Sequence, residues 1–179
     1  MKRLAVVLVL LAALAAGWAA DWSARPLEAA LLLSDLGAGA ADSLQKRITP
    51  RPQRQPLAAT IDNRPLTGDL YLPGERAQAG IVLVPGAAKD GKDDARLVAL
   101  AQSLARARFL VLVPDIANLR AQEIAAADRQ PILDAAHFLL SERHVPRVGI
   151  AAISYAGIPA VLAALDEPQV NFVVEVGAP

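Results

Sequence analysis

Ser154 lies between an expected strand and an expected helix, a position at which a serine can act as a nucleophile. Ser154 follows the apolar run Val148–Ile153 and precedes the segment Tyr155–Leu165, whose apolar residues recur at helical spacing. A strand that turns sharply into a helix presents such a serine at the carboxyl edge of a sheet, provided that the residues two before and two after it are small. Here those residues are Ala152 and Ala156. The pattern predicts a nucleophile elbow with strained backbone at Ser154; the alternative is an ordinary helix N-cap.

An acyl-transfer nucleophile needs N–H donors for the oxyanion that forms during attack. The backbone N–H of Tyr155, at the start of the expected helix, points toward the same spot as the serine. A second donor is expected from the loop after the apolar run Ile81–Val84, where Gly86 permits a sharp turn and Ala87 follows it. We expect Gly86 and Ala88 to line the pocket; the alternative for this loop is a plain connection between strand and helix.

Asp115 follows another apolar run, Phe109–Val113, through Pro114. Ligands of open α/β sheets bind beyond the carboxyl ends of the strands, and Asp115 stands at such an end. We therefore place Asp115 at the pocket, where it either lines the cavity or orders a loop.

The elements that must position these residues alternate along the chain. Two short strands flank a turn signal at residues 62–65, and four continuous apolar runs typical of strands buried on both faces follow. The six expected strands are Leu57–Ile61, Leu66–Leu72, Ile81–Val84, Phe109–Val113, Val148–Ile153 and Phe172–Val176. Three helical stripes lie between the later strands: Leu97/Leu100/Ala101/Leu104, Ile132/Leu133/Ala136/Leu139/Leu140 and Ile158/Val161/Leu162/Leu165. The order predicts an α/β fold with a mostly parallel sheet and flanking helices, each burying its stripe.

Three segments together resemble the α/β-hydrolases, and most closely the dienelactone-hydrolase-like branch. They are Ile81–Ala87, Val111–Asp115 and Ile150–Gly157, and the resemblance covers residues 57–179. It implies a Ser-acid-His triad in that chain order, an oxyanion hole from the N–H groups of Tyr155 and Ala87, and a small ester or similar acyl substrate. We expect no cofactor and no metal ion.

The chain's two histidines, His137 and His144, both precede Ser154. His137 falls on a flanking helix and His144 before the elbow strand, so we expect both to be structural. Glu175 lies inside the last expected strand, which disfavours it as the acid. We therefore expect residues 56–179 to be the N-terminal part of a hydrolase domain and this chain to be inactive. The alternative is a non-catalytic, membrane-tethered binding protein on the same fold.

The N-terminus has the layout of an export signal. Lys2 and Arg3 precede an uncharged run, residues 4–20, that is either cleaved as a signal peptide or retained as a membrane anchor. We expect an exported protein, periplasmic or extracellular. Residues 21–55 form a spacer with a short helix over Pro26–Leu36, whose leucine stripe packs on the membrane or on the domain. Then comes an extended basic linker, solvated or bound to anionic headgroups, containing Lys46, Arg47, Arg51 and Arg54.

Composition narrows the partners. Basic and acidic residues balance at 18 each. The chain therefore has no net positive charge that would attract nucleic acid. The chain has no cysteine, so disulfides, thiolate nucleophiles and cysteine-based metal sites are excluded. No G-x-G-x-x-G follows a strand, which disfavours nucleotide binding.

Overall fold

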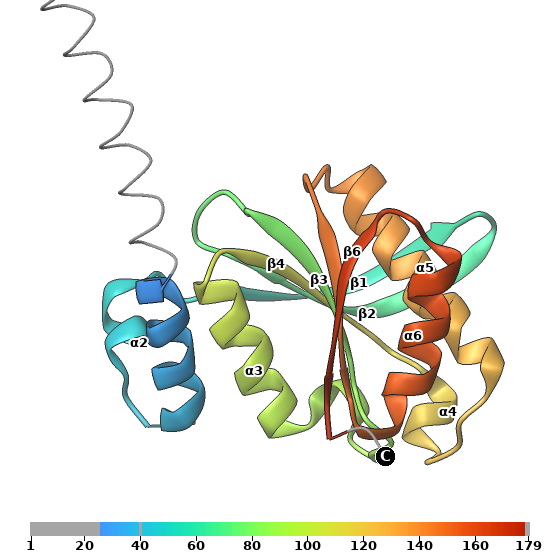
Figure 1. Cartoon of the computed structure of the whole chain (residues 1–179), viewed down its shortest axis with the longest axis horizontal. Coiled ribbons are helices and arrows are strands. Elements are labelled where there is room, and N and C mark those ends of the chain that lie inside the picture. The colour runs from blue at the N-terminus through green and yellow to red at the C-terminus, as the bar shows by residue number, and fades with distance from the viewer. Residues whose placement is uncertain (1–25, 40, 178–179) are drawn as a thin grey trace, which may run out of the picture.

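The structure is a computed structural model that describes residues 26–39 and 41–177. Within them, six strands form one sheet in the order β1-β2-β4-β3-β5-β6 (Figure 1). The strands are β1 (Gln53–Ile61), β2 (Arg64–Leu72), β3 (Ala79–Val84), β4 (Phe109–Pro114), β5 (Val148–Ile153) and β6 (Val170–Val176). The pairings from β4 through β3 and β5 to β6 are parallel, and those of β1 with β2 and β2 with β4 are antiparallel. The predicted mostly parallel α/β sheet is confirmed.

The hairpin between β1 and β2 depends on two residues at its tip. Asp62 and Asn63 have positive φ angles of 47° and 63°. Two successive left-handed residues make the kind of tight turn that matches strand twist, and Asn and Asp tolerate that conformation best among residues with a side chain. The turn predicted at residues 62–65 is therefore confirmed.

Helices cover both faces of the sheet, with α3 on one side and α5 and α6 on the other (Figure 1). Their bounds are α2 (Leu44–Ile48), α3 (Ala95–Arg106), α4 (Ala117–Arg120), α5 (Arg129–His137) and α6 (Gly157–Asp166); a π-helical turn, Phe138–Glu142, extends α5. Alternate residues of the central strands enter two separate cores. Val82, Leu112 and Ile150 contact the α5 and α6 side, whereas Ile81 and Val111 contact α3.

The α6 stripe is the clearest error of the sequence prediction. Ile158 is 54% exposed and Leu165 is 75% exposed, while Ala160 and Ala163 are fully buried. The helix thus turns its small residues toward the sheet and its large ones to solvent. Small side chains allow close approach to β5, itself rich in alanine, so packing at this position selects size rather than hydrophobicity. The stripes of α3 and α5 are oriented as predicted.

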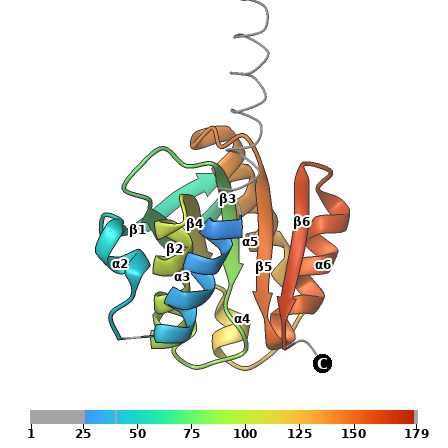
Figure 2. The same cartoon turned by 60° about the vertical axis from the view of Figure 1, so that its left-hand side comes forward.

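Strand β6 lies at the edge of the sheet, beside β5 and with its carboxyl end near the end of the chain (Figure 2). Its register pairs Phe172 with Gly149 and Val174 with Ala151, so these side chains share the α3 face. Phe172 lies over Gly149, where any Cβ atom would come within 2.2 Å of the ring. Phe172 and Val174 remain exposed, and the edge therefore presents apolar surface.

The N-terminal segment is more structured than the predicted spacer. Residues 26–38 are helical, in agreement with the short helix predicted over Pro26–Leu36. In contrast, α2 and the start of β1 occupy the stretch expected to be an extended linker. The prediction was wrong there because Ser43 caps α2 by accepting a hydrogen bond from the Lys46 N–H. Of the leucine stripe, Leu31 and Leu32 are half-buried, while Leu33 and Leu36 are exposed.

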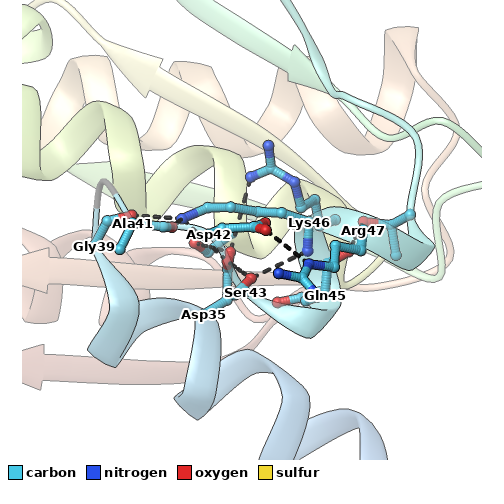
Figure 3. A network of polar contacts seen from close by, with 11 residues as sticks. Asp35, Gly39, Ala41, Asp42, Ser43, Gln45, Lys46 and Arg47 are labelled. Carbon is cyan, nitrogen blue, oxygen red and sulfur yellow. Dashed lines mark hydrogen bonds and ion pairs between the residues drawn. The ribbon is translucent and has the colours of Figure 1, made fainter.

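A buried carboxylate fastens this segment to α3. Asp35 is 1% exposed and accepts hydrogen bonds from the hydroxyls of Ser43 and, at 2.6 Å, Ser103 (Figure 3). Lys46 lies 3.5 Å and Arg106 3.8 Å from the same carboxylate. Burial alone would raise the pKa of Asp35, but the two hydroxyls and the two cations outweigh it and lower the pKa.

The predicted anchor, residues 4–20, lies outside the described residues. Among the helices that the structure does describe, none is long and apolar enough to span a bilayer.

Candidate active site

Ser154 lies where the sequence placed it, directly after β5 and at the start of a 3-10 turn that leads into α6. Its φ angle is +55°, in the left-handed region that residues with a side chain rarely adopt. Such a conformation costs about 1–2 kcal/mol, which the surrounding structure must supply. Ala152 and Ala156 are both buried, consistent with the requirement for small neighbours at a sharp turn.

The loop after β3 closes against the serine. A Cβ atom at Gly86 would lie 3.1 Å from the Ile153 carbonyl oxygen and 3.5 Å from the Ser154 Cβ. Only a residue without a side chain allows this approach without displacement of the neighbouring backbone. Gly86 therefore brings the loop of residues 85–90 beside Ser154.

A cavity of about 440 Å³ opens at this contact. The predicted residues Ser154, Gly86, Ala87 and Ala88 all line it. Its remaining lining is Pro85, Gly91, Asp94, Arg96, Leu97, Leu100 and Ile153. The volume suits a small organic molecule, and the wall is mainly apolar with a few polar groups.

Asp115 is not among the residues that line the cavity, so its predicted place in the pocket is wrong. Its carboxylate lies 3.1 Å from the Arg120 Nε, and its N–H donates to the Thr67 carbonyl at 2.9 Å. The Arg120 side chain in turn lies against Gly91, where a Cβ atom would meet the Arg120 Cγ at 2.7 Å. These contacts join the start of the loop after β4 to β2 and to α4, which favours loop ordering as the role of Asp115.

Tyr155 directs its side chain to solvent, 49% exposed and outside the cavity lining. Its predicted contribution is the backbone N–H at the start of the turn into α6, and that contribution stays a prediction.

Comparison with known proteins gives no matching family model and no matching curated sequence. Solved structures do match. A dienelactone hydrolase from Anabaena variabilis has 21% identity and a TM-score of 0.61, over 72% of this chain and 65% of that one. An α/β hydrolase from Penicillium has 18% identity and a TM-score of 0.60, over 70% of this chain and 46% of that one. An esterase from Rhizomucor miehei has 13% identity and a TM-score of 0.56, over 84% and 52%.

The chain has the α/β-hydrolase fold. The resemblance to the dienelactone-hydrolase-like branch is confirmed at the level of architecture. This chain spans about half to two thirds of the length of these solved structures, between 46% and 65%.

The sequence analysis did not identify two polar residues that line this cavity, Asp94 and Arg96. Asp94 caps α3 by accepting hydrogen bonds from the N–H groups of Arg96, at 2.9 Å, and Leu97, at 3.4 Å, and it pairs with the Arg96 guanidinium at 3.0 Å. The hydrogen bond from the Arg96 side chain is the main cause that lowers the pKa of Asp94 to about 2. A carboxylate of such low basicity is a poor general base at neutral pH. The acids before the helix were a usable signal, because an N-cap at the carboxyl edge must lie near the site.

Both histidines lie at the opposite end of the sheet, as predicted. His144 precedes β5 with a φ of +51°, and Ser154 follows that six-residue strand. Six strand residues span roughly 20 Å, far beyond hydrogen-bond reach. His137 ends α5, and its Nε2 contacts the Glu167 carboxylate at a separate hollow that also includes Asp62 and Ser141. Neither imidazole can take the Ser154 proton directly.

Across the described ranges, 26–39 and 41–177, no group of three or more His, Asp and Glu residues is placed to bind a metal ion.

Proposed function

We propose that the protein is a serine hydrolase of the α/β-hydrolase type that cleaves an ester or similar acyl compound with Ser154. The observation that carries this proposal is the left-handed Ser154 at the end of a buried strand, lining one cavity with Gly86 and Ala87. Strained residues of this kind concentrate at functional sites. An ordinary helix cap does not require a left-handed backbone, because N-cap residues adopt extended angles.

The reaction follows from these positions. The Ser154 Oγ attacks the substrate carbonyl carbon, its proton passes to a base, and the carbonyl electrons move onto oxygen. The N–H groups of Tyr155 and Ala87 stabilise that oxyanion. Collapse expels the alcohol, which takes up a proton, and leaves an acyl-Ser154 ester that water hydrolyses to the acid and free serine.

The described residues place no good proton acceptor beside Ser154. His137 and His144 lie at the other edge, and Asp94 is held ionised by Arg96. We propose that the triad His and acid of the working enzyme come from outside these residues. The chain alone then depends on water as the base and turns over slowly, because oxyanion stabilisation survives loss of the triad.

A direct test is hydrolysis of p-nitrophenyl acetate and butyrate by the full chain, its Ser154→Ala variant and its Ser141→Ala variant. Ser141 is an exposed serine at the opposite edge and serves as the matched control. We expect a slow rate that Ser154→Ala removes and Ser141→Ala retains. Equal rates for the unmodified chain and Ser154→Ala would refute Ser154 as the nucleophile.

A second candidate is a non-catalytic binding protein that uses the same cavity. No histidine lies beside Ser154 in the part of the chain that the structure describes, which favours this candidate. Ala152 and Ala156 favour it too, because they stand where a G-x-S-x-G elbow has glycines. Calorimetric binding of a phosphonate monoester, whose tetrahedral phosphorus resists turnover, tests it. Binding without any Ser154-dependent hydrolysis of the esters would support the binding protein.

Export through residues 1–20 remains part of the proposal, supported by the basic start and the apolar run. Mass spectrometry of the N-terminus of the protein made in its host distinguishes a cleaved signal from a retained anchor. An intact N-terminus on a protein found in the soluble cytoplasmic fraction would contradict export.

A further inference from the structure

The loop of residues 85–94, which forms one wall of the cavity, has little regular structure of its own. It links β3 to α3, and its one short element is the 3-10 turn Gly91–Asp93. Short loops of this kind are mobile unless they are fixed from outside, because their backbone makes few internal hydrogen bonds. What fixes this loop therefore decides how well Gly86 and Ala87 stay beside Ser154.

A buried carboxylate on β2 supplies a fixed point. The Asp69 side chain is only 5% exposed. Its Oδ2 accepts a hydrogen bond from the Lys92 Nζ at 2.8 Å and another from the Arg54 Nη2 at 2.5 Å. Asp69 is paired on both sides, with Pro56 of β1 and Val113 of β4, so the anchor is part of the rigid scaffold.

The loop is held by more than one bond. Arg54 bridges Asp69 to Asp93, which sits in the 3-10 turn beside Lys92. The Asp69 hydrogen bond is the main cause that raises the pKa of Lys92, and the Arg54 hydrogen bond is the main cause that lowers the pKa of Asp93. The four groups thus form one alternating network of two cations and two anions.

We propose that Asp69 and Lys92 are positioning residues that clamp the 85–94 loop to the sheet and so keep Gly86 and Ala87 beside Ser154. The proposal rests on the hydrolase function proposed for that site. Neither residue lines the cavity, so neither touches the substrate. They affect the reaction through the position of the Ala87 N–H. A displacement of such a group by about 1 Å can lower the rate by up to about 100-fold.

The molecule offers a matched control. Asp134 on α5 is also a buried carboxylate, and it accepts from the Arg64 Nη2 at 2.7 Å, far from the loop in sequence and outside the cavity lining. Asp134→Asn and Asp69→Asn therefore each remove a buried carboxylate charge that is paired with a partly exposed cation. Only Asp69→Asn releases the 85–94 loop.

Hydrogen–deuterium exchange of the full chain tests the clamp without relying on activity. Faster exchange in peptides covering residues 85–94 in Asp69→Asn, with no such change in Asp134→Asn, supports the proposal. Unchanged exchange in this segment overturns it, whether or not the chain hydrolyses esters. Lys92→Met, at a more exposed position, gives the same readout if Asp69→Asn fails to fold, and Lys92→Arg should restore slow exchange.

Ester kinetics then separate positioning from binding. We expect Asp69→Asn and Lys92→Met to lower the Ser154-dependent kcat about tenfold with KM little changed, because the N–H acts on the transition state. Lys92→Arg should recover most of kcat, and Asp134→Asn should retain it. A normal kcat in Lys92→Met despite faster exchange also overturns the proposal. A chain with no Ser154-dependent turnover refutes the proposed function, a result distinct from a failed exchange experiment.

Discussion

The carboxyl end of β5 differs from its amino end in the chemistry that each presents. At the carboxyl end Ser154 lines an apolar cavity with Gly86 and Ala87 but has no imidazole beside it. At the amino end His137 contacts Glu167 in a polar hollow, apart from the strained serine. Each end thus holds a part of what a Ser-His-acid set requires. Residue types alone do not make a catalytic site unless the fold brings them within hydrogen-bond distance.

If the protein is the proposed hydrolase, the largest effect is expected from supplying a base beside Ser154. Imidazole at tens of millimolar should enter the open cavity and take the Ser154 proton, raising the Ser154-dependent rate of p-nitrophenyl acetate hydrolysis about 10- to 100-fold. Imidazole also attacks the ester in solution, so the rate with Ser154→Ala at equal imidazole is subtracted. If the two proteins respond equally, the carboxyl end lacks more than a base.

The next largest effect concerns the amino end of β5 and the response of its stability to acidic pH. Burial alone would raise the pKa of Glu167, but hydrogen bonds from the Gln169 N–H and from His137 outweigh it and lower the pKa below its ordinary 4.5. A lowered folded-state pKa stabilises the protein above the unfolded value, and this stabilisation is lost as pH falls through the folded-state pKa. We expect the urea concentration at the unfolding midpoint to decrease as the pH is lowered below about 4.5. In Glu167→Gln this decrease should be less steep. Parallel curves for the two proteins would show that Glu167 carries no such linkage.

The sequence predicted the framework of this comparison because strands and helix ends leave local signals. The runs ending at Val84 and Ile153 fixed which loops meet at the carboxyl edge, and hence the meeting of Gly86, Ala87 and Ser154. The same logic put both histidines at the far edge.

What sequence analysis missed depends on contacts between distant segments. The Arg54, Asp69 and Lys92 network requires the register of β1 against β2 and the course of a loop, neither of which has a local signature. The α6 stripe failed for a different reason. Periodicity identifies an apolar face, but Ala160 and Ala163 show that the space above β5 admits only small side chains.

A smaller effect compares the two left-handed residues that flank β5, Ser154 at +55° and His144 at +51°. Glycine relieves the strain at either position, offset in part by the greater freedom of the unfolded chain, so each substitution should stabilise by about 0.5–1 kcal/mol. Urea unfolding measures this for Ser154→Gly and His144→Gly. Ser154→Gly should also abolish the slow hydrolysis, and His144→Gly should leave it. A destabilised Ser154→Gly would mean that the hydroxyl makes contacts worth more than the strain.

The smallest effect is expected from removing both histidines. His137→Ala and His144→Ala together should leave the Ser154-dependent rate within about twofold, because each imidazole is separated from Ser154 by the length of β5, roughly 20 Å. The stability should fall by only about 1 kcal/mol, the worth of the lost contact between His137 and Glu167 at a partly exposed site. Rates of the double variant are compared with those of Ser141→Ala, which alters the same hollow without touching an imidazole. A robust activity that disappears with the histidines would place a base beside Ser154 by some route other than this fold. The separation of nucleophile and imidazole along β5 would then be wrong.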